Sequence, residues 1–201
     1  MSIDLTGRVA LVTGAGTDPG LAIAQALAAA GASLCCVDLN PDRAESSAQA
    51  IGQAGGSAFG WQADISNKFQ AAGAIEEIRD VYGRLDVLVQ ATAIRPQQDL
   101  LTMDEWEFRR TVEYNLVGSF FIAQLAARVM ADEGGGLIAL LVDPVDPQNA
   151  QGSGALAASQ AGVAALAMVF AQEVAASRVA VGALPVSTTQ ATVQALMSLF
   201  T

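Results

Sequence analysis

Three glycines and an acid near the start of the chain could hold a nucleotide. Gly14, Gly16 and Gly20 lie between a short apolar run and an alanine- and leucine-rich stretch, and Asp38 ends the next apolar run. A glycine-bearing turn between a strand and a helix can bring backbone N–H groups against a pyrophosphate. An acid at the end of the second strand can accept hydrogen bonds from a ribose and would repel a 2′-phosphate. The pattern indicates a dinucleotide crevice. Two structural interpretations stay open, in which the glycines only form a tight turn and Asp38 caps the turn at Asn40.

Composition restricts the other chemistries. The chain contains no histidine, which excludes Ser-His-Asp and Cys-His nucleophile systems and histidine-ligated metal sites, and we expect no metal. Cys35 and Cys36 are adjacent, and neighbouring strand residues point to opposite faces, so we expect two reduced core thiols. Asp143 and Asp146 each precede a proline, which is typical of turn residues, although two such acids could also form a general-base pair.

The charge balance disfavours two classes of partner. The 201-residue chain carries 20 acidic and 10 basic residues, a net charge of −10. Such a surface repels phosphate backbones and anionic lipids, so we expect no nucleic acid or membrane partner. The longest strongly apolar stretch, 161–171, is shorter than the roughly 18–20 residues of a membrane span, and we see no signal peptide. We therefore expect one cytoplasmic domain over residues 1–201.

Strand-like apolar runs alternate with helix-like stretches along the chain. We expect strands over 8–13, 33–38, 57–63, 85–90, 137–142 and 178–184, and helices over 21–30, 42–54, 68–82, 103–131, 154–177 and 189–199, the fourth being one helix or two. Strands that are apolar throughout are typical of parallel strands covered on both faces. The sequence therefore predicts an α/β fold, a Rossmann-type doubly wound parallel sheet of about six strands.

Short motifs at matching positions extend from the glycine turn to the last strand. They are Thr13–Gly16 with Gly20–Ala22, Val37–Leu39, Ala63–Ser66, Gly83–Val89, Trp106, Asn115–Leu116, Ser159, Ala161–Val163 and Arg178–Pro185. Together they resemble the short-chain dehydrogenase/reductase family over almost the full length. The resemblance implies that Asp38 selects NAD over NADP, that Asp64 meets the adenine, and that Asn115 belongs to a catalytic tetrad of Asn, Ser, Tyr and Lys.

The sequence departs from the family pattern where the chemistry takes place. Asp143 stands where the family places its serine, and Leu156 and Gln160 stand at the tyrosine and lysine of the Tyr-x-x-x-Lys motif. Leucine cannot transfer a proton, and glutamine carries no charge that would lower the pKa of a phenol. We therefore expect a degenerate tetrad, a pseudoenzyme, with no catalytic residue in this chain. Asn115 is the tetrad residue that is kept, and a structural role could explain it.

The cofactor positions depart as well. Asp18 replaces a family glycine, Pro19 removes an N–H donor, and Gln90–Ala93 replaces the family's Asn-Asn-Ala-Gly. A carboxylate about 4 Å from a pyrophosphate costs about 4 kcal/mol at an effective dielectric constant of 20. We expect no cofactor in this chain, and NAD in a partner subunit. The remnant cofactor positions are Gly14, Gly16, Gly20, Asp38 and Asp64.

The end of the sequence is short for the family. Few residues follow Pro185, so we expect a fold that is truncated at the C-terminus, without a seventh strand or a substrate lid.

The segment 154–177 is apolar on nearly all sides, so we expect it to be buried against both the sheet and a second partner. In the family, this helix and the one carrying Asn115 form a four-helix bundle with a neighbouring subunit. The expected contact face of segment 103–131 consists of Phe120, Phe121, Leu125, Val129 and Met130.

These observations predict a non-catalytic structural subunit of a heteromeric NAD-dependent alcohol dehydrogenase. It would pair through 103–131 and 154–177 with an active, related subunit in a hetero-oligomer such as an α2β2 heterotetramer. The arrangement is similar to heteromeric family members with one degenerate subunit, such as hydroxybenzylsuccinyl-CoA dehydrogenase, and a hydroxyacyl-CoA is a candidate substrate by that analogy alone. Two alternatives stay open: a regulator that senses NAD without catalysis, and an enzyme with relocated catalytic residues such as Asp143.

Overall fold

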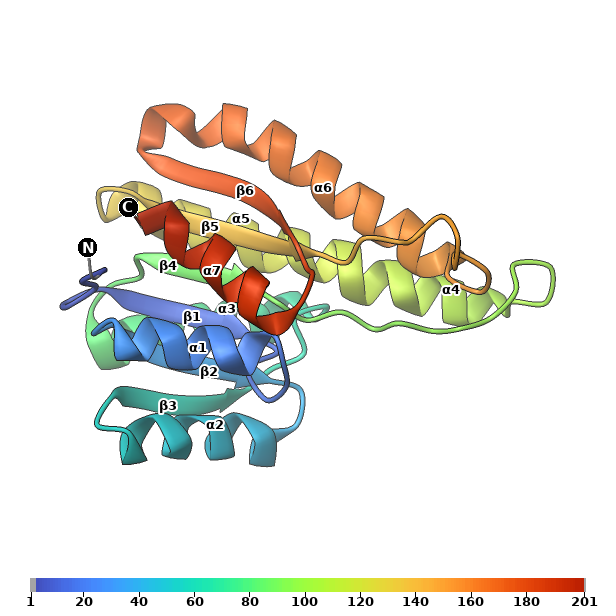
Figure 1. Ribbon diagram of the computed structural model, residues 1–201. Helices are drawn as coiled ribbons and strands as arrows, with labels where there is room; N and C mark the ends of the chain where they lie inside the picture. Colours follow the sequence, from blue (N-terminus) through green and yellow to red (C-terminus); the bar gives the residue numbers. More distant parts are fainter. Residues whose placement is uncertain (1–2, 201) are drawn as a thin grey trace.

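Six parallel strands form one sheet in the order β3-β2-β1-β4-β5-β6, in a computed structural model that describes residues 3–200 (Figure 1). The strands are β1 (Val9–Thr13), β2 (Ser33–Asp38), β3 (Ser57–Gln62), β4 (Val87–Gln90), β5 (Gly136–Val142) and β6 (Val179–Pro185). The helices are α1 (Gly20–Ala29), α2 (Pro41–Gln53), α3 (Lys68–Tyr82), α4 (Glu105–Val112), α5 (Gly118–Asp132), α6 (Gly154–Val174) and α7 (Thr189–Met197). The predicted Rossmann-type fold class is confirmed, and the described residues contain six strands.

Helices cover both faces of the sheet and create two apolar cores. One core includes Ala71 of α3, Ile122 of α5 and Val163 of α6, packed against the strands. The other includes Ile23 of α1, Ile51 of α2 and Leu196 of α7. Because both faces are buried, the strands are apolar on both sides, which explains their near-continuous apolar sequence.

The two cysteines illustrate this arrangement. Cys35 belongs to the α3/α5/α6 core and Cys36 to the α1/α2/α7 core, and both thiols are free. Burial raises the pKa of the Cys36 thiol to about 12 and raises that of Cys35 as well. The expectation of two unreactive core thiols that are not joined by a disulfide agrees with this placement.

The segment predicted as 103–131 is interrupted in its middle. A π-helical turn, Glu113–Val117, joins α4 to α5 and inserts one extra residue into the helical path. Asp104 caps α4, since its carboxylate accepts a hydrogen bond of 2.7 Å from the N–H of Trp106. The π turn therefore changes which side chains of the following helix face the sheet.

Helix α6 covers the sheet with one side only. Leu156, Val163 and Ala167 are buried, whereas Ala161 and Ala165 on the other side are exposed. The expected packing of one side against the sheet is present, and burial of the other side against a partner stays a prediction. Together with the following turn, the helix spans 24 residues and contains an 18-residue window with a mean hydropathy of 1.7. By length and composition it could cross a membrane, so the apolar stretch is longer than the expected 161–171. A core helix of a globular fold meets the same criterion of length and composition, and one side of α6 packs against the sheet.

Candidate functional site

The loops that follow β1, β2 and β4 meet at the carboxyl ends of these neighbouring strands. They enclose a crevice of about 180 Å³ whose lining includes Gly14, Asp18, Asp38, Thr92 and Tyr114. This is the switch point of the strand order, where open α/β sheets bind their ligands. Pockets that hold small molecules usually measure roughly 300–1,000 Å³, so this crevice is small for a dinucleotide.

The glycine turn is shaped by close backbone contacts. A Cβ at position 20 would overlap the carbonyl group of Gly14, so α1 can approach β1 only with glycine there. The N–H of Leu21, in the first turn of α1, donates to the carbonyl oxygen of Thr17 at 3.0 Å. A first-turn N–H that a phosphate could have used is therefore satisfied within the loop.

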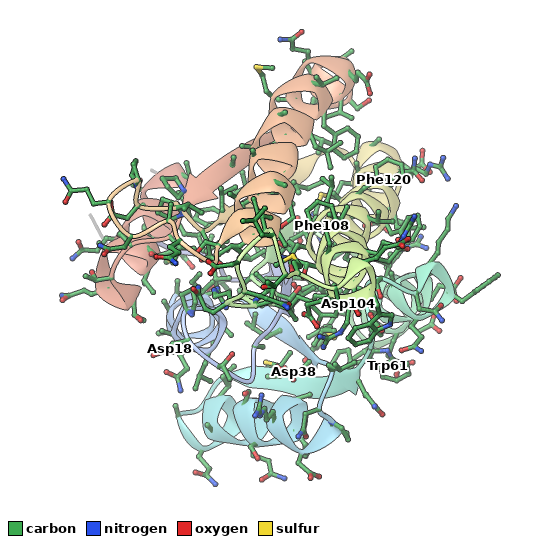
Figure 2. All side chains as sticks on the ribbon, turned by 90° about the vertical axis from the view of Figure 1, so that its right-hand side faces the viewer. Asp18, Asp38, Trp61, Asp104, Phe108 and Phe120 are labelled. Atoms are coloured by element: carbon green, nitrogen blue, oxygen red, sulfur yellow. The ribbon has the colours of Figure 1, made fainter. Side chains whose placement is uncertain are left out.

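Asp18 and Pro19 lie at the rim of this turn. The Asp18 side chain is exposed and lines the crevice, and Pro19 has no N–H to offer. Figure 2 views the strand ends and places Asp18 and Asp38 on the α1/α2 side of the molecule, away from Phe108 and Phe120.

Asp38 and Asp64, the two acids expected at the adenosine end, both have local partners. The carboxylate of Asp38 accepts hydrogen bonds from the N–H of Gly16 at 3.1 Å and of Asn40 at 2.9 Å. The carboxylate of Asp64 accepts from the N–H of Ser66 at 2.9 Å. The structure therefore contains the hydrogen bond by which Asp38 caps the turn at Asn40. The carboxylates of Asp38 and Asp64 each keep lone pairs that could accept from a further donor.

Tyr114 is a site residue that sequence reasoning missed. Its side chain lines the crevice together with Thr92 and Asp38. Burial, followed by the negative charges of Asp64 and Asp38, raises the pKa of Tyr114 to about 12. In the sequence, the one indication that Tyr114 could belong to the site is its position next to Asn115. The direction of its side chain depends on the π turn, which the sequence does not indicate.

Asn115 lies in the π turn and holds two segments together. Its side-chain amide accepts from the N–H of Ile94 at 2.8 Å and donates to the carbonyl oxygen of Ile94 at 3.0 Å and to Oγ of Ser159 at 3.1 Å. Asn115 is 1 % exposed, so these contacts use its hydrogen-bonding capacity inside the protein. This geometry agrees with a structural role.

The three substituted tetrad positions lie together and contact one another or new partners. The N–H of Asp143 donates to Oε1 of Gln160 at 3.0 Å, and the carboxylate of Asp143 pairs with Nε of Arg95 at 2.6 Å. Leu156 is buried beside them on α6. Asp146 instead accepts from the N–H of Gln148 in a local turn, so the two acids do not form a general-base pair.

The remaining candidates for proton transfer lie elsewhere. The hydroxyl of Tyr82 hydrogen-bonds Oγ of Ser57 at 3.0 Å, beside the start of β3, and Lys68 lies over the ring of Phe121. The sequence holds no further lysine and no tyrosine besides Tyr82 and Tyr114. Within the described residues, no tyrosine–lysine pair is positioned to move a proton at the substituted tetrad.

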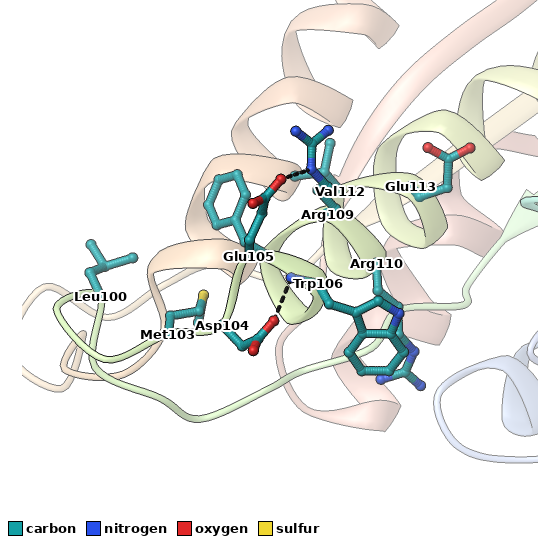
Figure 3. A pocket seen from close by; sticks show the side chains of 10 residues that line it. Leu100, Met103, Asp104, Glu105, Trp106, Arg109, Arg110, Val112 and Glu113 are labelled. Atoms are coloured by element: carbon teal, nitrogen blue, oxygen red, sulfur yellow. Dashed lines mark hydrogen bonds and ion pairs between the residues drawn. The ribbon is translucent and has the colours of Figure 1, made fainter.

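A larger hollow lies outside the crevice, on the surface of α4. It measures about 790 Å³ and includes Leu100, Met103 and Trp106 (Figure 3). The ion pair between Glu105 and Arg109, with an Nε–Oε1 distance of 2.6 Å, crosses its edge. It contains none of the tetrad positions, so it belongs to the outer surface of the long helices.

The outer surface of the long helices exposes several large apolar side chains beside the charged residues of α4. Its exposed members include Trp106, Phe108, Phe120, Met168 and Val169. One part of the predicted contact face is wrong: Met130 is fully buried in the sheet-side core, and Phe121, Leu125 and Val129 pack partly against that core. Phe120 is the exposed member of the predicted group.

The sequence matches the short chain dehydrogenase family over residues 8–198. D-threitol dehydrogenase from Mycolicibacterium smegmatis is 33% identical over 172 residues, which cover 84% of this chain and 65% of that protein. (3R)-3-hydroxyacyl-CoA dehydrogenase from Mus musculus is 33% identical over 178 residues, covering 84% of this chain and 69% of that protein. This chain thus spans about two thirds of the length of these curated relatives.

Solved structures agree with this match. A short-chain type dehydrogenase/reductase from Mycobacterium marinum is 31% identical with a TM-score of 0.86, and the alignment covers 90% of this chain and 75% of that one. A short chain dehydrogenase from Mycobacterium smegmatis has a TM-score of 0.93 at 23% identity, covering 100% of this chain and 88% of that one, and this likeness shows the fold alone.

Proposed function

Since the chain belongs to the short-chain dehydrogenase family, we propose that it is a non-catalytic subunit that supports a related, active dehydrogenase. The active partner holds NAD and oxidises a secondary alcohol. The curated relatives include dehydrogenases named for threitol and for 3-hydroxyacyl-CoA, and the substrate of the partner belongs to this class of CH–OH compounds.

One observation carries the loss of catalysis. At the tetrad, Gln160 bonds the backbone of Asp143, Asp143 pairs with Arg95, and Leu156 stands at the tyrosine position. Hydride transfer from an alcohol requires a group that removes the hydroxyl proton, and a hydrocarbon side chain cannot do so. The carboxylate of Asp143 is held in its ion pair with Arg95, while its Oδ2 makes no hydrogen bond, so no unpaired base stands at the tyrosine position.

The crevice supports the absence of a cofactor in this chain. Its volume of about 180 Å³ is small, the exposed carboxylate of Asp18 lies at its rim, and the first-turn N–H of Leu21 is already bonded. These features disfavour a dinucleotide in this chain. The same three features also disfavour the alternative function, a regulator that senses NAD without catalysis.

The apolar outer face supports the assembly role. Helix α6 exposes Ala158, Ala161 and Ala165 with Met168 and Val169, in positions three, four or seven residues apart along one side. Small exposed residues allow a second helix to approach closely, and burial of this stripe would remove apolar surface from water. The partner surface on this chain is therefore the outer side of α4, α5 and α6.

The direct test is an assay of hydride transfer. The purified chain, given NAD with threitol, glycerol or a 3-hydroxyacyl-CoA, should produce no NADH above the rate without protein, because no base is present to take the hydroxyl proton. Formation of NADH is followed by absorbance, and an active family member in the same assay provides the positive control. NADH production by this chain that disappears in an Asn115→Ala variant would contradict the proposal.

A further inference from the structure

We propose that the side chain of Tyr114 fills the adenosine end of the dinucleotide crevice and by itself excludes a nucleoside. The inference rests on the proposed function in one respect, since it gives a cause for the absence of a cofactor. It assigns a blocking role to a residue that lies outside the glycine turn and outside the substituted tetrad.

The position of the ring is the first step of the argument. Tyr114 lines the crevice together with Asp38, Leu39 and Thr92, which belong to the loops after β2 and β4. Thr92, in the loop after β4, lines the same crevice. The side chain of Tyr114 therefore borders the crevice between the π turn and the loop after β4.

The groups around the phenol are those that would meet an adenosine. By the family resemblance, Asp38 receives the ribose hydroxyls and Asp64 meets the adenine, and both carboxylates act on the phenol of Tyr114. In this proposal the aromatic ring takes space that a purine with its sugar would need. The N–H groups of Gly16 and Asn40 already use part of Asp38, so the carboxylate does not depend on a ligand to be satisfied.

The π turn explains why the ring stays in place. Residues 113–117 take the extra residue of this turn, and the neighbouring side chain, Asn115, is fixed by three hydrogen bonds to Ile94 and Ser159. Arg110, one turn earlier on α4, packs against Trp106 with its guanidinium carbon 5.3 Å from the ring centre. With its neighbours fixed, Tyr114 has little freedom to swing out.

Adenosine is the appropriate probe because it carries no phosphate. The charge of Asp18 repels a pyrophosphate but has little effect on an uncharged nucleoside. Binding of millimolar adenosine, measured by calorimetry, should be undetectable for the native chain and for Asp18→Gly. It should appear in Tyr114→Val, with an affinity at least about tenfold higher. Tyr114→Phe keeps the ring and should still exclude adenosine.

Two controls decide whether regained binding is specific. Tyr82→Val removes the other tyrosine, which lies beside Ser57, and should not admit adenosine. Asp38→Asn added to Tyr114→Val should weaken the regained binding, because the amide nitrogen replaces a ribose acceptor. Adenosine binding by the native chain, by Asp18→Gly or by Tyr114→Phe would overturn the inference, as would a folded Tyr114→Val variant that binds none.

A second measurement applies even if Tyr114→Val fails to fold. In a Tyr82→Phe background Tyr114 is the only tyrosine, and its phenolate absorbance can be titrated directly. The groups that act on it are Asp64, Asp38, Thr92 and Arg110. Asp64→Asn should lower the pKa of Tyr114, and an unchanged titration would place the phenol away from the adenosine end and overturn the inference. Unexpected adenosine binding or an unchanged titration would overturn only this inference. The proposed function would instead be overturned by hydride transfer from an alcohol to NAD.

Discussion

At position 143 a carboxylate follows the fifth strand, and its charge is balanced by a residue from another loop. Arg95 lies on the segment after β4 and pairs with Asp143, whose side chain is 12% exposed. Gln160 completes the contact by accepting the N–H of Asp143. A carboxylate without a partner would be costly to bury in this position. The residues at positions 143 and 160 are therefore physically linked, and together with Arg95 they form contacts where the family has reacting groups.

Asp86 gives the clearest pH dependence at the residue scale. Burial alone would raise its pKa, but hydrogen bonds from Arg84, Arg8 and the N–H of Val9 outweigh burial and hold the pKa below its ordinary value. The pKa is lower in the folded than in the unfolded chain. The stabilisation is therefore present above the unfolded pKa of roughly 3.9 and is lost as the pH falls through the folded pKa.

Asp86→Asn should accordingly lower the free energy of unfolding at neutral pH by about 2 kcal/mol. The difference from the native chain should shrink below about pH 4, since the native carboxyl also becomes protonated. Urea unfolding at several pH values measures this. Asp80→Asn, at an exposed position of α3, is the matched control with little effect. A difference that stays constant down to acid pH would contradict the assigned hydrogen bonds.

At the scale of elements, the junction between β1 and α1 depends on one close approach. The backbone of Gly20 touches the carbonyl group of Gly14, which fixes the angle at which α1 crosses the sheet. The π turn between α4 and α5 has a similar effect on the other side, since it sets the directions of Tyr114 and Asn115. Both features orient elements around the crevice independently of whether the crevice binds a ligand.

Gly20→Ala should therefore destabilise the fold by about 1–3 kcal/mol, because its methyl group would overlap backbone that cannot move freely. Gly52→Ala is the matched control. Gly52 lies within α2 and a Cβ there meets no atom within 4 Å, so the better helix propensity of alanine should stabilise by up to about 1 kcal/mol. Thermal and urea unfolding compare the two variants. Equal effects would show that close packing at Gly20 is unimportant.

The strands could be predicted because most of their apolar runs are nearly continuous, and α1, α2, α3 and α5 could be predicted because a glycine follows shortly after each of them. The π turn could not, because Glu113–Val117 contains no proline or glycine that would signal a change of helix type. The ion pair of Arg95 and Asp143 joins distant parts of the chain, so the sequence does not indicate that the two residues are partners. Met130 was assigned to the wrong side because α5 is apolar on several sides, and sequence alone does not say which side faces the sheet.

At the scale of the whole molecule, the two buried cores contrast with an apolar outer side. The sheet is covered by α1, α2 and α7 on one face and by α3, α5 and α6 on the other (Figure 1). Outside this body, α6 exposes Met168 by 62% and Val169 by 48%. A chain with net charge −10 that keeps an uncharged helical face is suited to association through that face.

Ala165→Arg should disrupt this association, because it places a long charged side chain in the middle of the stripe. The isolated native chain should sediment as species larger than its 20.6 kDa mass, and the variant should shift strongly toward the monomer. Sedimentation velocity measures the distribution. Gln53→Arg introduces the same side chain on the exposed side of α2 and serves as control. A monomeric native chain, or a variant that associates like the native one, would contradict the assignment of the face.

The placement of Cys35 and Cys36 in separate cores has a consequence for how the protein responds to its surroundings. Each sulfur is screened from water by a different set of helices, and burial keeps both protonated. Thiol reagents therefore have no point of attack on the native fold, since these are the only two cysteines in the sequence. As long as the protein stays folded, its thiols do not respond to thiol–disulfide conditions, whatever electron transfer an associated enzyme carries out.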